Sequence, residues 1–120
     1  MVHRISKGAI QKLLSGETKD PKYAAVVKVY GNGCHYCHAL KESFEGVSKN
    51  FEDIFFFAFN IADYPDLERI LGFNGIPTIC FIQNDGKTPK IRLMPEPDVP
   101  HERTWYTAQG IRDFIEKERL

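Results

Sequence analysis

The sequence has no excess of charge of either sign, no long apolar run and few cysteines, and each absence excludes a class of protein. Basic and acidic residues number 16 each, so the formal net charge is zero. The basic surface that binds nucleic acids or anionic membranes is therefore not expected. No segment approaches the roughly 18 consecutive apolar residues of a membrane-spanning helix. Three cysteines are too few for a small scaffold held by disulfides.

The length and the first residues bound the organisation of the chain. A chain of 120 residues with 42% hydrophobic residues is long enough for one core and too short for two domains. The segment up to Gln11 lacks the apolar stretch and the cleavage site of an export signal. We expect a single domain spanning residues 1–120, cytoplasmic and monomeric, that binds neither nucleic acid nor membrane.

Apolar periodicity and turn residues predict the order helix, strand, helix, strand, helix, strand, strand, helix. The turn signal at 84–86 predicts that the last two strands pair antiparallel. The nearly continuous apolar run at 54–61 predicts a strand buried on both faces. The order predicts an α/β protein whose mixed sheet of four or five strands has helices on both faces. The helices are expected to begin near Ser6, Cys34, Pro65 and Thr107, and the strands to cover 23–30, 54–61, 78–82 and 90–94.

Cys34 and Cys37 open the second predicted helix, at the end of a strand where sites collect in such sheets. The unpaired amides and the dipole of the first helical turn favour a thiolate on Cys34. Cys34 can attack a substrate disulfide, and Cys37, one turn along, can resolve the mixed disulfide. His35 can stabilise the thiolate or be merely an exposed residue. This pattern predicts dithiol–disulfide exchange, with no cofactor and no metal.

These residues resemble the thioredoxin family. Three features carry the resemblance: the strand 24–30, Cys34-His35-Tyr36-Cys37 at a helix start, and Gly75-Ile76-Pro77-Thr78 before another strand. The resemblance extends from about Tyr23 to the end of the chain. It implies the thioredoxin fold, a cis peptide bond before Pro77, and a substrate peptide bound as an added strand at Ile76 and Pro77, near Tyr36.

The same resemblance implies a protein-disulfide reductase that takes part in electron transport and cell redox homeostasis. Its partners would be proteins that contain disulfides, and a thioredoxin reductase or the glutathione system would supply electrons.

Four positions depart from the family. Gly33 and Tyr30 stand where tryptophans are usual, and Lys28 replaces the buried acid expected six residues before Cys34. The lysine that accompanies that acid aligns with Ala58. A desolvated Lys28 could be neutral and accept a proton, or be charged and stabilise a thiolate; it could equally extend to solvent and have no role.

Two alternatives keep the fold. A glutathione-linked glutaredoxin would need a Gly-Gly turn, and residues 83–86 read Gln-Asn-Asp-Gly. A thioredoxin-fold subunit could instead dock a partner through Tyr36, Ile76 and Pro77 without redox chemistry. Replacing both cysteines by serine separates docking from exchange.

Two further alternatives use the cysteines as ligands. The stretch from Cys34 to His38 also matches the attachment pattern of a c-type haem, with Met94 available as a second axial ligand. This reading is weakened because that attachment commonly takes place outside the cytoplasm. Zinc would need a fourth ligand besides Cys34, Cys37 and His38, and Cys80 and His101 stand alone. Cys80, within an apolar run, is expected to be a small buried hydrophobic residue.

Overall fold

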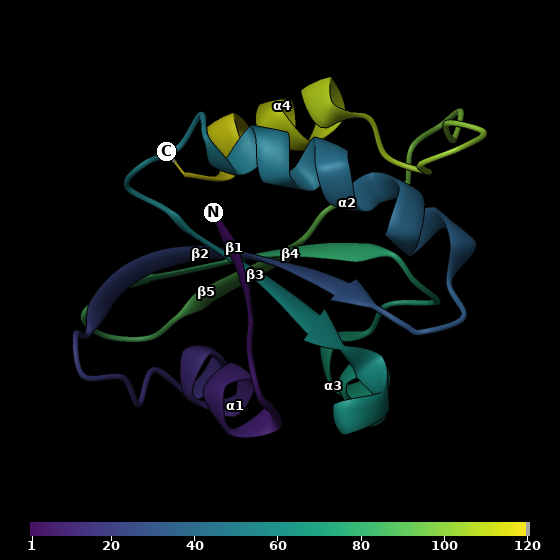
Figure 1. Ribbon diagram of the computed structural model, residues 1–120. Helices are drawn as coiled ribbons and strands as arrows, with labels where there is room; N and C mark the ends of the chain where they lie inside the picture. Colours follow the sequence, from purple (N-terminus) through teal and green to yellow (C-terminus); the bar gives the residue numbers. More distant parts are fainter. Residues whose placement is uncertain (120) are drawn as a thin grey trace.

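The computed structural model describes residues 1–119 and contains a five-stranded sheet between two layers of helices (Figure 1). The strand order is β1-β3-β2-β4-β5; β3 lies parallel to β1 and β2, whereas β4 is antiparallel to β2 and β5. Helices α2 and α4 cover one face, and α1 and α3 cover the other. The expected mixed sheet is confirmed. In chain order the elements are β1 (Val2–Arg4), α1 (Lys7–Ser15), β2 (Lys22–Tyr30), α2 (His35–Ser48), β3 (Phe55–Asn60), the 3-10 helix Ile61–Asp63, α3 (Leu67–Leu71), β4 (Thr78–Asp85), β5 (Lys90–Leu93) and α4 (Ala108–Glu118).

Local signals set the helix ends. The Ser6 hydroxyl accepts a hydrogen bond from the amide of Ala9 at 3.2 Å, and the Thr107 hydroxyl accepts one from Gly110 at 3.0 Å. Helix α1 ends at Gly16, whose φ of 84° lies in the left-handed region that glycine adopts without strain. The predicted starts of α1 and α4 are confirmed.

Two details differ from the expectation. Strand β1 was not predicted, because three residues are too few to show a period and only their pairing with β3 defines them as a strand. The expectation that β3 is buried throughout is wrong at Phe55, whose side chain is 60% exposed. This ring stacks on Phe57 at 5.9 Å between centroids, while Phe56 and Phe59 are buried on opposite faces.

Side chains of β2 alternate between two cores, as the pleat requires. Val26 belongs to the cluster under α2 and α4, and Val27 and Val29 belong to the cluster with α1 and α3. By the same alternation Lys28 lies on the α2 face, within the hydrophobic layer. The alternation therefore directs a charged side chain toward the helix that carries both cysteines.

Candidate active site

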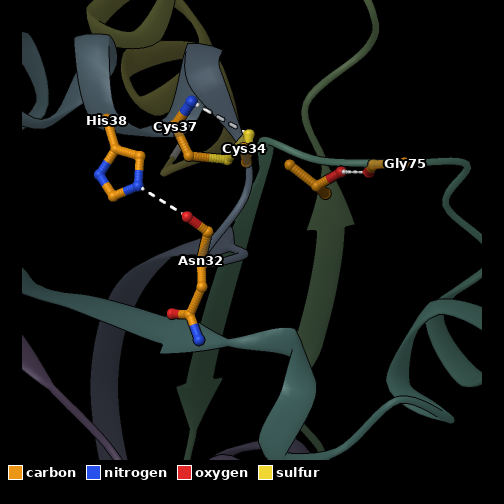
Figure 2. Close-up of a disulfide and its surroundings, with 6 residues drawn as sticks. Asn32, Cys34, Cys37, His38 and Gly75 are labelled. Carbon is orange, nitrogen blue, oxygen red and sulfur yellow. Dashed lines mark hydrogen bonds between the residues drawn. A yellow bond between two sulfur atoms is a disulfide. The ribbon is translucent and has the colours of Figure 1, made fainter.

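The loop after β2 places Cys34 at the start of α2 (Figure 2). Cys34 has extended backbone angles, and its amide donates to the carbonyl of Gly31 at 3.1 Å. Its sulfur accepts a hydrogen bond from the amide of Cys37 at 3.1 Å, so it caps the helix in the place a serine or aspartate usually takes. The positive end of the helix dipole is thus directed at the Cys34 sulfur.

Cys34 and Cys37 are joined by a disulfide, with 5.2 Å between their Cα atoms. The two sulfurs differ in access, because Cys34 is half-buried whereas Cys37 is only 3% exposed. An incoming protein disulfide can therefore reach Cys34 more readily than Cys37. This difference fits the order of attack and resolution that the spacing predicts.

The segment before β4 packs against the loop that precedes Cys34. The Ile76–Pro77 peptide bond is cis, which confirms the expectation. Thr78 Oγ1 donates to the carbonyl of Gly75 at 2.8 Å and holds the turn (Figure 2). A Cβ on Gly31 would lie 2.6 Å from Cδ1 of Ile76. A side chain at Gly31 would therefore displace the end of the Ile76 side chain, which shows how closely the two loops pack.

Tyr36 contacts a residue that the sequence reasoning missed. Its ring meets that of Trp105 edge-on, with 5.3 Å between centroids. Trp105 comes from the proline-rich segment between β5 and α4, where two backbone hydrogen bonds of 3.0 Å join it to His101. Its φ of 65° is rare for a bulky residue, so the loop holds this side chain in a defined place. The one signal in the sequence is that Trp105 is the only tryptophan.

Lys28 lies behind the disulfide. Lys28 is only 5% exposed, so its side chain does not extend into solvent, which was one of the expected alternatives. Its ammonium is 5.5 Å from the ring centroid of Phe44 and 5.9 Å from that of Tyr30. Burial, and to a lesser extent the charge of nearby Lys41, lowers the pKa of Lys28 from 10.5 to about 8, while Glu45 opposes the shift. Lys28 and Cys37 line the same cavity, of about 410 Å³.

The two histidines of the motif differ in their contacts. His35 is exposed, and its ring lies 5.9 Å from that of Tyr36. His38 Nε2 lies 3.0 Å from the carbonyl oxygen of Asn32, to which it donates (Figure 2). His38 therefore holds the loop that precedes Cys34.

The residues considered as metal or haem ligands do not form a ligand set in the described part of the chain. Among residues 1–119 no group of three or more His, Cys, Asp and Glu side chains is placed to hold a metal. Met94 packs against the core under α2 and α4. Cys80 is 1% exposed, and burial raises the pKa of its thiol to about 12, so it is the small buried hydrophobic residue that was expected.

A disulfide at a helix N-terminus, beside a cis-proline and in a mixed sheet of this order, defines a thiol–disulfide oxidoreductase site. The family profile described as thioredoxin matches residues 10–96. The chain therefore belongs to the thioredoxin family. No helix among residues 1–119 has the length and apolar character needed to cross a membrane.

Comparison with individual proteins agrees with this family assignment. Over 70 residues the chain is 37% identical to a thioredoxin of Borreliella burgdorferi, a match that covers 58% of this chain and 59% of that protein. The fold resembles chloroplastic thioredoxin z, with a TM-score of 0.67, 20% identity and coverage of 97% and 92% of the two chains. It also resembles the reduced thioredoxin pre-protein of Schistosoma mansoni, with a TM-score of 0.68, 18% identity and coverage of 97% and 96%.

Proposed function

We propose that the protein reduces or exchanges disulfide bonds of other proteins through the Cys34/Cys37 couple, acting as a single thioredoxin-like domain of residues 1–120. One observation carries the proposal: the disulfide joins an accessible Cys34 at the N-terminus of α2 to a buried Cys37. Exchange with a substrate disulfide can then begin at Cys34. We assign it, as a monomer, to electron transport and cell redox homeostasis in the cytoplasm.

The exchange takes two steps. In the dithiol form, the Cys34 thiolate attacks one sulfur of a substrate disulfide, and the other substrate sulfur leaves as a thiolate. Cys37 then loses its proton and attacks the Cys34 sulfur of the mixed disulfide. The Cys34–Cys37 bond forms, the second substrate sulfur leaves, and two electrons have passed to the substrate. A thioredoxin reductase or glutathione restores the dithiol.

Lys28 takes the place of the missing acid and acts on Cys37 by its charge. With a pKa of about 8 it is mostly protonated at neutral pH. An ammonium beside the same cavity as Cys37 favours the thiolate over the thiol. His35, one residue after Cys34, adds to the positive potential at the first sulfur when it is protonated.

The substrate peptide lies along the edge formed by Ile76 and Pro77. An extended chain there pairs its backbone with the segment before β4, as in other strand-addition complexes. Tyr36 and Trp105, whose rings meet edge-on, supply aromatic contacts to this peptide in the proposal. Gly33 stands where a tryptophan would be usual, and Trp105 is the only tryptophan of the chain.

Reduction of insulin disulfides, with dithiothreitol as electron donor, tests the proposal. We expect Cys34→Ser to abolish activity, and Cys37→Ser to accumulate a mixed disulfide between Cys34 and the substrate. Cys80→Ser is the matched control, since that thiol is buried away from the site. A docking subunit would keep its partner binding in the Cys34→Ser/Cys37→Ser double variant and would lack insulin reduction in the wild type.

The reduction potential, measured in glutathione buffers, separates two modes of action. A value near roughly −270 mV indicates a reductant, and one near roughly −180 mV indicates an isomerase-like or glutathione-linked enzyme. Absence of a reversible two-electron couple would overturn the exchange mechanism.

A further inference from the structure

The cavity behind the disulfide concentrates positive charge in a chain that carries none overall. Three basic side chains line it, Arg4 from β1, Lys28 from β2 and Lys41 from α2, together with one carboxylate, Glu45. With His38 neutral, these groups give a formal charge of 3 − 1 = +2, whereas the whole chain has a formal charge of zero. This local excess attracts anions.

None of the three cations is neutralised by an ion pair. Among residues 1–119 the salt bridges join Arg69 to Asp66 and Arg119 to Asp53, both outside the cavity. The Arg4 guanidinium donates to the neutral phenol oxygen of Tyr30, at 2.8 and 2.6 Å.

The one carboxylate of the cavity is already engaged. Glu45 accepts a hydrogen bond from the backbone amide of Val2 at 3.0 Å. It forms no ion pair within the part of the chain that the structure describes. With this carboxylate counted, three basic side chains face one acidic side chain in the cavity, so the excess of positive charge remains.

Lys28 is the most unusual of the three. Its side chain is 95% buried, since 5% is exposed, and its ammonium makes no hydrogen bond or ion pair with the described residues. Among the described residues, every side-chain nitrogen or oxygen that is closed to solvent has a hydrogen-bond partner. The Lys28 ammonium therefore opens into the cavity that it lines. A buried charge without a partner is costly, and a bound anion would remove that cost.

The size and the walls of the cavity indicate the kind of anion. A volume of about 410 Å³ is within the range of small-molecule sites and far exceeds the roughly 30 Å³ that one water occupies. Tyr30, Phe44 and Val2 contribute apolar surface beside the cations. A single inorganic oxyanion would leave most of this surface uncovered.

We propose that this cavity binds a small organic anion with carboxylate or phosphate groups, held by Arg4, Lys28 and Lys41. The body of the ligand lies against Tyr30 and Phe44. The site differs from the peptide-binding edge, because it is formed by β1, β2 and α2 and reaches the disulfide from the side of Cys37.

Binding of the anion should also change the reduction potential of the Cys34/Cys37 couple; this consequence rests on the function proposed above. In the dithiol form, deprotonation of Cys37 yields a thiolate that competes with the ligand for the Lys28 ammonium, so the ligand binds the disulfide form more tightly. Ligand bound preferentially to the oxidised protein lowers its reduction potential. A tenfold preference corresponds to about 30 mV for this two-electron couple.

Titration calorimetry on the oxidised protein tests the binding directly, with phenyl phosphate, succinate and inorganic phosphate as probes at low ionic strength and pH 7. We expect saturable 1:1 binding of phenyl phosphate or succinate that is tighter than binding of inorganic phosphate. Lys28→Met should weaken it roughly tenfold or more. Lys41→Gln, at an exposed lysine that leaves the core intact, should weaken it roughly two- to fivefold.

Lys87→Gln is the matched control, since Lys87 is exposed in the turn between β4 and β5 and should leave binding unchanged. Absence of saturable binding by both organic probes, or unchanged affinity in both cavity variants, would overturn the proposal. Inorganic phosphate binding as tightly as the organic probes would refute the role of the apolar wall. The measurement uses no disulfide exchange, so its result is independent of the insulin assay.

Discussion

Replacing Lys28 by methionine should stabilise the protein, because the folded state holds an ammonium that water would solvate better. Folding lowers the pKa of Lys28 from 10.5 to about 8, mainly through burial of a side chain that is 5% exposed. Each pKa unit corresponds to about 1.36 kcal/mol, so this shift amounts to about 3 kcal/mol. Methionine has similar length and no charge. We expect Lys28→Met to raise the free energy of unfolding by about 3 kcal/mol at pH 7.

The gain should depend on pH in a defined direction. Between about pH 8 and 10.5 the unfolded chain keeps a proton on Lys28 that the folded protein has lost. The free energy of unfolding of the wild type therefore gains from this group as the pH rises across that window. The advantage of Lys28→Met, full below pH 8, should shrink toward zero near pH 10.5.

Urea unfolding of the oxidised proteins, followed by the fluorescence of Trp105, measures this difference. Equal slopes against urea for wild type and variant would show that both unfold between comparable states. Lys87→Met serves as control, since that lysine is exposed and its change should leave stability nearly unaltered. No gain at pH 7, or a gain that is the same at pH 10, would refute the claim that Lys28 is desolvated.

Three further predictions concern the site. Trp105→Ala, which removes the ring beside Tyr36, should raise KM for insulin roughly tenfold and leave the reduction potential unchanged; an unchanged KM would exclude Trp105 from the substrate surface. Gly31→Ala places a Cβ 2.6 Å from Cδ1 of Ile76, which must then shift, and should raise KM roughly two- to tenfold, again without a change in potential. The affinity for phenyl phosphate should fall as the pH rises through about 8, because Lys28 then loses its charge. Arg4, Lys41, Glu45, His38 and Tyr30 also face the cavity, and Lys28→Met should remove this pH step.

Much of the fold is determined by short-range patterns in the sequence. Ser6 and Thr107 start helices because their hydroxyls bond amides three residues on, and Gly16 ends one because it tolerates positive φ. Residues 86–89 join β4 to β5, and these strands pair antiparallel, as the turn signal at 84–86 predicts. Cys34 and Cys37 follow the same logic, since two residues between cysteines at a helix start bring their sulfurs together without help from the rest of the chain.

Contacts between distant segments could not be predicted in this way. Strand β1 exists only through its pairing with β3, and that pairing brings Arg4 to Tyr30. The loop of Trp105 has no period, so its approach to Tyr36 depends on how α4 and α2 pack.

Lys28 illustrates both the part that the local sequence determines and the part that tertiary packing determines. Its place in an alternating strand already put it on one face of the sheet, within an apolar run. That its ammonium is buried without a counter-ion, behind Cys37 and among other cations, depends on which side chains β1 and α2 bring to that face. The sequence by itself determined the two cysteines and their chemistry; the charge that surrounds them was decided only by tertiary packing, because electrostatic environment is a property of neighbours in space.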